Sequence, residues 1–452
     1  PPPAHYPGDT SSAASDVYKR QATVIAGVAG TAWQARVASK ERDAARLEAE
    51  RAGAVSEFLT GLFEISDPDR NDGADLTARE VLDRGYAELD QLDDQPELQV
   101  SLRKTMGHVY SKLGMHEKSK EIFDEVLVSY IELYGNESYE ATDCRISLAI
   151  TCLESSYYDE AEAHLEECLP IRRTQEPKDN TWLSMPLRSL ARVVGDKGDS
   201  QRSVELYEQA FALMTPETFA DKQDMGRSHN NYGSALSNVG RYADADSAFA
   251  RAEEFWLDSI DENHTYFGAL YSNWALCKSE LDRNEEAEVL HRKALAIKRH
   301  LKHNKVQIGV SLINLGNLIV DRGRPEEGLP LLVEALEINR AAFGNAHYYT
   351  AAAVINVGTA ELALGRFDEA EAHYREGEEI FREIFGPEHA AVAIAHTRLG
   401  QAAHQRGDLV RAERILREAV AIHLSLIHIS EPTRQDTRSR MPASAGKGGG
   451  GG

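Results

Sequence analysis

The chain has 452 residues, with 73 acidic and 50 basic side chains and a formal net charge of −23. Because a nucleic-acid-binding protein needs a basic surface that neutralises phosphates, this charge argues against a nucleic-acid partner. The proportions of hydrophobic (42%) and charged (27%) residues are typical of a soluble globular protein and exclude a disordered chain or a multi-span membrane protein. The four cysteines are too few and too irregularly spaced for a disulfide framework or a zinc ribbon.

Both ends of the chain resemble translated sequencing adaptors. Residues 16–21 have the sequence DVYKRQ and residues 424–429 the sequence LSLIHI. The two strands of one oligonucleotide, the end sequence of transposase-based sequencing libraries, encode these two peptides, and their flanks extend the resemblance to residues 11–21 and 424–434. We therefore expect residues 1–21 to be adaptor-derived and disordered and residues 424–452 to be an adaptor-derived tail, and we exclude both from the fold prediction. The remainder is then expected to be an internal piece of a longer protein.

The first native segment, Ala22–Trp33, is an apolar run. Its length, roughly 18 Å as a helix, is short of a bilayer core of about 30 Å. We predict the surviving end of a transmembrane helix, with Trp33 at the interface and Arg36 and Lys40 among the headgroups. An ordinary apolar helix start or a signal-peptide remnant is the alternative. The expected localisation is membrane-anchored, otherwise cytoplasmic, with the side of the membrane left open.

Residues 22–66 are predicted to be this apolar segment followed by a charged linker helix, and residues 67–95 a capping segment.

From residue 96 to residue 423, small residues recur at fixed positions of a repeat, and each such position forms a column when the repeats are aligned. The first column, at a spacing of 42 with one step of 41, is Gly107, Ala149, Ala191, Gly233, Ala275, Gly316, Gly358 and Gly400. Twelve residues later stand Ser119, Ala161, Ser203, Ala245, Ala287, Gly328, Ala370 and Ala412. Seven further on stand Val126, Cys168, Ala210, Ala252, Ala294, Ala335, Gly377 and Ala419.

A fourth column lies between the first two and consists mainly of helix breakers. It contains Gly114, Ser156, Gly198, Gly240, Asp282, Gly323, Gly365 and Gly407. This pattern predicts eight helical hairpins, in which small residues lie where the two helices cross and the breaker ends the first helix in a left-handed cap. Each hairpin buries its apolar face against its neighbours, so the predicted fold class is an all-α solenoid.

The spacing of the three small columns resembles that of the tetratricopeptide repeat, lengthened by about two helical turns. The motif FG-x-x-H at Phe343–His347 and Phe385–His389 makes the repeats similar to the kinesin light chain type. HEAT or armadillo repeats have a similar length but lack this Gly/Ala register. The resemblance implies a right-handed α-solenoid of helix-turn-helix repeats that acts as a protein-interaction scaffold and binds a peptide or protein partner in a concave groove lined by the first helices.

The segments before the repeats carry a second resemblance. Residues 46–68, 76–89 and 95–114 look like the region that joins the membrane helix to the repeats in bacterial Ser/Thr protein kinases with tetratricopeptide tails. This resemblance implies a kinase domain upstream of Ala22 and a scaffold role for the present chain. The alternative is a soluble protein in which the repeats precede another catalytic domain, for example a peptidase.

Motifs for catalysis or cofactor binding are missing from the sequence. There is no phosphate-binding loop, no kinase HRD or DFG motif, no HExxH, no nucleophile elbow and no CxxC. We therefore predict that this chain is not an enzyme and holds no cofactor or metal. His264, His347 and His389 share one repeat column before a first helix, which favours a structural cap over metal ligation. Cys152 and Cys168 are interpreted as small core residues.

An asparagine column stands two residues before the first small column, at Asn231, Asn273, Asn314 and Asn356. Asparagine is a poor helix former, so its repetition at one helical position needs a reason. In tetratricopeptide domains the matching position faces the groove, and the resemblance implies hydrogen bonds to a bound peptide backbone. The alternative is a hydrogen bond between repeats. The neighbours expected to supply specificity are Arg227, Asn230, Ser234, Ser272 and Asn317.

A local basic patch interrupts the acidic chain between Val289 and Val320, where there is no Asp or Glu. Its members are Arg292, Lys293, Lys298, Arg299, Lys302 and Lys305. One interpretation is a solvated convex face balanced by carboxylates such as Glu334 and Glu337. The other is a docking site for an acidic or phosphorylated partner segment.

Overall fold

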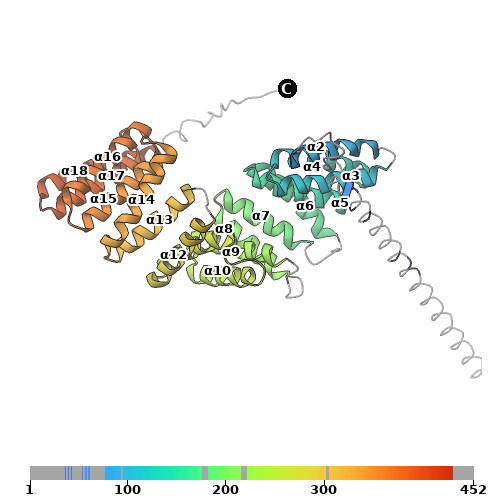
Figure 1. The fold of residues 1–452 in the computed structure, drawn as a ribbon, viewed down its shortest axis with the longest axis horizontal. Coiled ribbons are helices and arrows are strands. Elements are labelled where there is room, and N and C mark those ends of the chain that lie inside the picture. The colour runs from blue at the N-terminus through green and yellow to red at the C-terminus, as the bar shows by residue number, and fades with distance from the viewer. Residues whose placement is uncertain are drawn as a thin grey trace, which may run out of the picture. The chain divides into compact units, whose positions relative to one another are not determined.

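The computed structural model describes residues 77–92, 95–175, 182–214, 221–301 and 305–430, together with eight single positions between residues 36 and 61. The secondary structure in these ranges is helical throughout (Figure 1). The predicted membrane segment Ala22–Trp33 and the adaptor-like residues 1–21 lie outside the described residues. Of the predicted tail 424–452, residues 431–452 also lie outside them, whereas residues 424–430 belong to the last helix of the described chain. Within the described ranges, no helix combines the length and the apolar character that crossing a bilayer requires.

The chain divides into two compact units between Lys197 and Gly198. Unit 1 contains α2 (Ala78–Glu88), the 3-10 turn η1 (Leu89–Leu92), α3 (Pro96–Lys112), α4 (His116–Tyr134), α5 (Tyr139–Glu154), α6 (Tyr158–Thr174) and α7 (Ser184–Asp196). Unit 2 contains α8 (Ser200–Ala212), α9 (Lys222–Asn238), α10 (Tyr242–Leu257), α11 (Thr265–Glu280), α12 (Asn284–His300), α13 (Lys305–Asp321), α14 (Pro325–Phe343), α15 (Tyr348–Ala363), α16 (Phe367–Phe385), α17 (Ala390–Gln405) and α18 (Leu409–Ser430). The division separates the two helices of the expected third hairpin, and the proposed domain boundaries stay predictions.

Within each unit the helices pack in sequential pairs. In unit 1, α3 packs on α4 and α5 on α6, and in unit 2 the pairs run from α9 with α10 to α17 with α18. The second helix of a pair also contacts the first helix of the next pair, as α14 does α15. The apolar core is therefore continuous along a unit: Phe249, Trp256, Phe267 and Leu290 belong to one buried cluster that crosses two pairs. This is the all-α repeat solenoid that the sequence predicts.

The small residues lie where paired helices approach most closely. A Cβ atom placed on Gly233 would lie 2.8 Å from the ring of Phe249, and one on Gly316 would lie 2.8 Å from the side chain of Leu332. In unit 1, the hydroxyl of Ser119 donates a hydrogen bond of 2.8 Å to the carbonyl oxygen of Gly107, its counterpart in the same pair. Larger side chains at these positions would force the two helices apart, so the predicted role of the small columns is confirmed.

All eight residues of the breaker column have the predicted left-handed backbone. Their φ angles are Gly114 75°, Ser156 63°, Gly198 96°, Gly240 78°, Asp282 58°, Gly323 76°, Gly365 72° and Gly407 90°. At the end of α9, for example, Gly240 donates its amide to the carbonyl of Ser237 and Arg241 donates to that of Leu236, at 3.0 and 2.9 Å. These bonds occupy carbonyl groups that the end of the helix would otherwise leave without a donor.

The predicted capping role of the histidine column is also confirmed. Nδ1 of His264, His347 and His389 accepts a hydrogen bond from the amide of Tyr266, Tyr349 and Ala391, at 3.3, 3.2 and 3.2 Å. In the two FG-x-x-H motifs the histidine ring also stacks on the phenylalanine that ends the preceding helix, with ring centroids 4.4 Å apart for Phe343 and His347. The glycine between them, Gly344, has φ 81° and ψ −177°, a conformation that is essentially restricted to glycine.

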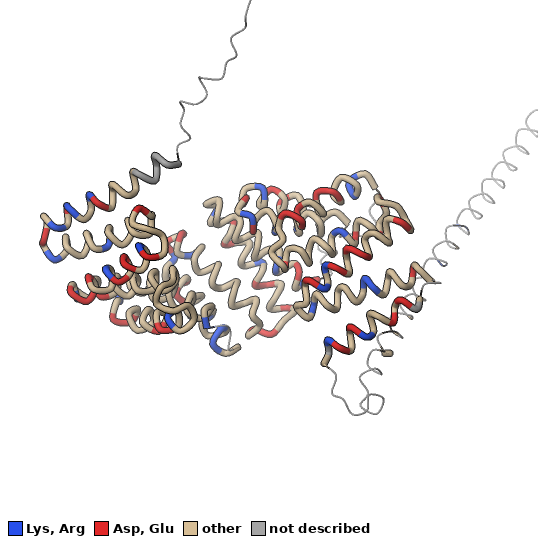
Figure 2. Tube along the Cα trace, turned by 90° about the horizontal axis from the view of Figure 1, so that it is seen from above, with Lys and Arg blue, Asp and Glu red and all other residues tan. Residues whose placement is uncertain are grey.

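Ion pairs join consecutive pairs of helices. Lys197 Nζ lies 2.6 Å from a carboxylate oxygen of both Asp159 and Glu162 in unit 1. In unit 2, Arg322 contacts Glu285 and Glu288 in the corresponding way. Acidic and basic residues are accordingly interspersed along the helices (Figure 2). The pairs with an exposed carboxylate, such as Lys197 with Asp159, stabilise a unit by only about 0 to 1 kcal/mol each.

Candidate functional site

The first helices of unit 2 carry the predicted asparagine column. Asn231 lies on α9, Asn273 on α11, Asn314 on α13 and Asn356 on α15, and all four are half-buried. Consecutive first helices lie next to each other: α9 contacts α11, and α13 contacts α15. Between α11 and α13, the side chain of Lys298 bridges the two helices from α12. The four amides therefore form a column across neighbouring helices, with one member on each.

The four amides differ in their hydrogen bonds. Nδ2 of Asn273 donates to Ser234 Oγ of the preceding pair at 3.3 Å, which is the repeat-to-repeat contact considered above. Oδ1 of Asn231 accepts from Nδ2 of its neighbour Asn230 at 3.3 Å. For Asn314 and Asn356, the described part of the chain provides no hydrogen-bond partner to the side-chain amide. Two of the four amides thus keep their full donor and acceptor capacity.

The predicted specificity residues lie beside the column in different environments. Asn230 is 8% exposed, and its Oδ1 has no partner within the described residues. Arg227 lies with its guanidinium carbon 5.7 Å from the ring centroid of Tyr266. Ser234 donates to the carbonyl of Asn230 at 3.1 Å, and Ser272 to that of Gly268 at 2.9 Å. Asn317 is half-buried on α13. The binding role of these residues stays a prediction.

Two helices of the asparagine column, α11 and α13, also carry exposed apolar side chains, which were not predicted from the sequence. Val310 precedes Asn314 by one turn and is 44% exposed, and Leu276 follows Asn273 by three residues and is 49% exposed. Residues three or four apart share one face of a helix, so these side chains flank the amide column. Their signal in the sequence was an apolar residue one turn from the asparagine position.

The basic patch is less positive than its composition indicates. Arg292 pairs with Glu288 at 2.8 Å, and Arg299 pairs with Glu334 at 2.6 Å. The ammonium of Lys293 lies 5.0 Å from the ring centroid of Tyr271. Lys298 is not a surface cation, because it is only 8% exposed, and the assumption that it belongs to a solvated patch was wrong. Its neighbour Lys302 lies outside the described residues, and Lys305 is exposed on α13.

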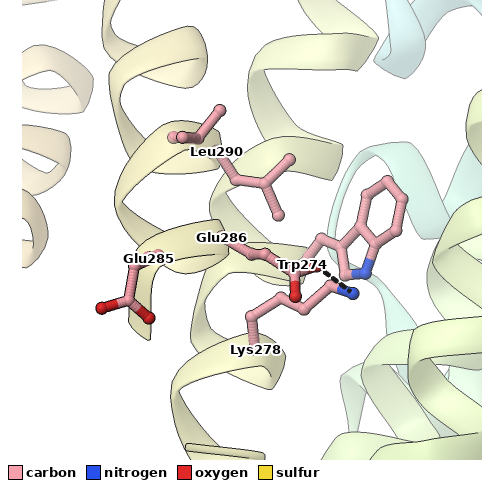
Figure 3. Close-up of a pocket in the computed structure, with 6 residues that line it drawn as sticks. Trp274, Lys278, Glu285, Glu286 and Leu290 are labelled. Atoms are coloured by element: carbon pink, nitrogen blue, oxygen red, sulfur yellow. Dashed lines mark ion pairs between the residues drawn. The ribbon is translucent and has the colours of Figure 1, made fainter. Parts of the chain in front are cut away.

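A shallow hollow of about 290 Å³ lies between α11 and α12 and is lined by Trp274, Lys278, Glu285, Glu286, Val289 and Leu290 (Figure 3). The ammonium of Lys278 forms ion pairs with Glu286 at 3.0 Å and with Asp246 of α10 at 2.7 Å. It also lies 5.3 Å from the ring centroid of Trp274. Lys278 is thus paired with Asp246 and Glu286, and Glu285 with Arg322, which indicates a structural cluster.

Clusters of metal-ligating side chains and free thiols are the remaining candidates in the described part of the chain. No group of three or more His, Cys, Asp or Glu residues is placed there to hold a metal ion. Cys144, Cys152, Cys168 and Cys277 are free and buried, as expected for core residues. Burial raises the pKa of the Cys168 thiol to about 11, so this thiol is not an activated nucleophile.

Comparison with known proteins supports the repeat assignment. The family described as tetratricopeptide repeat matches residues 98–174, 307–383 and 353–425. A curated relative, Protein KINESIN LIGHT CHAIN-RELATED 3 of Arabidopsis thaliana, is 22% identical over 236 residues. The match covers 52% of this chain and 36% of the relative, so the chain spans about a third of that protein's length.

Two solved structures share the fold over most of the chain. The apo form of RapI has a TM-score of 0.54 at 13% identity, with 84% of this chain and 98% of RapI covered. The apo form of the quorum sensor NprR from B. thuringiensis has a TM-score of 0.50 at 15% identity, with 74% and 99% covered. At these identities the likeness concerns the fold alone. The described chain is therefore an all-α repeat solenoid, and its residues 98–174 and 307–425 match tetratricopeptide repeats.

Proposed function

We propose that unit 2 binds an extended peptide segment along the asparagine column of α9, α11, α13 and α15. The observation that supports this most directly is the pair of half-buried amides at Asn314 and Asn356, which have no hydrogen-bond partner within the described residues. An amide both donates and accepts, so it can hydrogen-bond the backbone of an extended chain whatever its side chains are. Each such bond contributes about 0.5 to 1.5 kcal/mol.

Side-chain selection in this proposal comes from the flanking residues. Val310 and Leu276 present apolar surface next to the column, and Arg227 and Asn317 supply polar contacts. A partner segment that alternates backbone contacts with apolar side chains fits this arrangement. Because buried apolar area supplies much of the affinity in such interfaces, we expect the apolar residues to set the strength of binding and the amides to set its register.

The experiment is capture of random acetylated octapeptides on an array by the purified protein, in the wild-type form and with Asn314 and Asn356 changed to alanine. We expect binding by the wild type and a loss of about tenfold or more in the double variant, as two lost hydrogen bonds imply. Leu133→Ala on α4 of unit 1 is a matched control that removes an exposed side chain far from this column in sequence. Equal capture by all three proteins would refute the proposal.

We further propose that the chain is the scaffold tail of a membrane-anchored bacterial Ser/Thr protein kinase. The support is the resemblance of residues 46–68, 76–89 and 95–114 to the joining region of such kinases, together with the apolar run Ala22–Trp33. Sequencing the complete gene tests this directly. A kinase domain encoded upstream of Ala22 would support the proposal, and a catalytic domain such as a peptidase after His423 would favour the alternative.

A further inference from the structure

A buried lysine without a carboxylate partner lies between α11 and α13. Lys298 of α12 is 8% exposed, and its side chain passes so close to Gly268 that a Cβ atom there would lie 3.4 Å from Lys298 Cγ. Its Nζ donates to Ser272 Oγ of α11 at 3.0 Å and to Ser311 Oγ of α13 at 2.8 Å. Both acceptors are neutral hydroxyl groups, so neither compensates the charge of the ammonium.

Two other buried cations among the described residues have carboxylate partners. Lys278, one helix away, pairs with Asp246 and Glu286, and Arg172 of unit 1 lies 3.5 Å from Asp143. For Lys298, by contrast, no carboxylate oxygen of the described residues lies within 4.0 Å of Nζ. Burial accordingly lowers the pKa of Lys298. An unpaired buried charge raises the free energy of the folded state, and an anion bound next to Lys298 would offset that cost.

Two hydrogen-bond donors at this site have no acceptor among the described residues. An ammonium group has three N–H donors, and two of them are used by Ser272 and Ser311. The hydroxyl of Ser272 donates to the carbonyl of Gly268, whereas that of Ser311 finds no acceptor among the described residues. One N–H of Lys298 and the O–H of Ser311, which is 2% exposed, therefore lack an acceptor among the described residues. Two adjacent donors match the two oxygens of a carboxylate.

The site lies within the proposed peptide path. Ser272 directly precedes Asn273, and Ser311 lies three residues before Asn314, so the pair of serines sits next to two members of the amide column. Two helical turns before Lys298 on the same helix, His291 is buried, and its pKa is lowered by burial and by the charge of Lys298. His291 therefore adds no second cation to the site.

We propose that Lys298, with Ser272 and Ser311, binds an Asp or Glu side chain of the extended partner segment at the register between Asn273 and Asn314. This inference rests on the proposed function and assigns the partner an acidic residue at one position. The net charge of −23 repels acidic peptides in general. A cation in a low-dielectric site, screened little by salt, selects one carboxylate against that background.

The test is an array of acetylated octapeptides of random sequence, each made in two forms with Glu or Gln at position 5 and attached through its C-terminus. We expect the wild type to capture the Glu forms of its best ligands about tenfold more strongly, which corresponds to one charge-assisted contact. Lys298→Met, which keeps the length and apolar stem of the side chain, should abolish this preference. Lys112→Met removes an exposed lysine of α3 in unit 1 and is the matched control that should retain it.

Equal capture of Glu and Gln forms by the wild type, or an unchanged preference in the Lys298→Met protein, would overturn the inference while leaving peptide binding intact. Failure of every peptide to bind would instead overturn the proposed function. In that case the carboxylate site is tested directly by NMR. Wild-type protein labelled with ¹³C,¹⁵N-lysine is titrated with sodium acetate and, as a control, with sodium chloride at equal ionic strength. A saturable shift of the Lys298 Nζ resonance with acetate alone supports the carboxylate site, and no shift refutes it.

Should Lys298→Met fail to fold, Ser311→Ala removes one donor and preserves the charge. It should lower the preference for Glu about threefold or more, as loss of one neutral hydrogen bond implies. An undiminished preference in a folded Ser311→Ala protein would contradict the assigned geometry.

Discussion

The ring of His389 stacks on the ring of Phe385, with centroids 4.2 Å apart and an interplanar angle of 17°. The same histidine caps α17 by accepting a hydrogen bond from the amide of Ala391. One side chain therefore fixes both the end of α16, through Phe385, and the start of α17. Gly386, with φ 85°, makes the sharp turn between them possible.

His389→Ala should destabilise unit 2 by about 1.5 to 3 kcal/mol, because it removes both the helix cap and the ring stack. His389→Asn keeps an oxygen that can cap the helix and removes only the ring, so its loss should be about half as large. Urea unfolding of the two variants measures these differences. If alanine and asparagine at this position gave equal losses, the cap would contribute nothing and the motif would depend on stacking alone.

The breaker column gives a second prediction. A Cβ atom on Gly365 would meet no heavy atom within 4 Å, yet the residue has φ 72°. Gly365→Ala should therefore destabilise by about 1 to 2 kcal/mol through backbone strain alone. Gly365→Asn should cost clearly less, because asparagine tolerates the left-handed region. Gly358→Ala is the comparison: there a Cβ would lie 2.9 Å from the ring of Tyr374, so the loss is steric. Thermal melting of the three variants measures these losses. Equal losses of melting temperature for Ala and Asn at residue 365 would contradict the strain argument.

The repeat columns were predictable from the sequence because the backbone conformation or the helix packing at each column restricts which side chains fit there. The left-handed cap at Gly365 and the close crossing at Gly358 both limit side-chain size, and such limits are visible in one sequence. The burial of Lys298 was not predictable from the sequence. Its neighbours in sequence are surface cations, and only the approach of α11 and α13 from either side buries it. The division at Gly198 was equally hidden, because residues on both sides of it keep the repeat register.

The asparagine column gives a third prediction, which separates structure from binding. Asn273 is bonded to Ser234 of the preceding pair, whereas Asn314 and Asn356 have no such partner within the described residues. Asn273→Ala should therefore cost about 0.5 to 1.5 kcal/mol of stability, and Asn314→Ala and Asn356→Ala close to none. Chemical unfolding of the single variants measures this. A large loss for Asn314→Ala would indicate a structural role at that position and weaken the binding proposal.

Changing all four asparagines to alanine should abolish peptide capture. The stability of this fourfold variant should fall by no more than the sum of the Asn231 and Asn273 contributions, because those two alone have hydrogen bonds within the described residues. An unchanged melting temperature together with a loss of peptide capture would support a binding role for the asparagine column. Retained binding would assign capture to the flanking apolar residues instead.

The last prediction concerns the acid sensitivity of unit 2. His291 is 2% exposed, and burial, with a contribution from the charge of Lys298, lowers its pKa from 6.5 to about 4. Its Nδ1 has no hydrogen-bond partner within the described residues, so nothing stabilises the protonated ring. Because the pKa is lower in the folded than in the unfolded chain, the unfolded state takes up the proton first as the pH falls. The contribution of His291 is thus fully present above pH 6.5 and is lost progressively as the pH falls towards 4.

Between pH 7 and pH 5 the wild type should lose about 2 kcal/mol of stability through this group, at 1.36 kcal/mol per pH unit below the unfolded-state pKa. His291→Leu removes the titrating ring, so its stability should change less over the same interval. His404→Leu, at an exposed position of α17, is the matched control and should follow the wild type. Urea unfolding at the two pH values measures the three differences. Carboxylates with lowered pKa values, such as Asp246 and Glu288, titrate in all three proteins and cancel in the comparison. Equal pH dependence of the wild type and the His291→Leu protein would show that the imidazole is hydrated or paired in solution, and the burial argument for this residue would then fail.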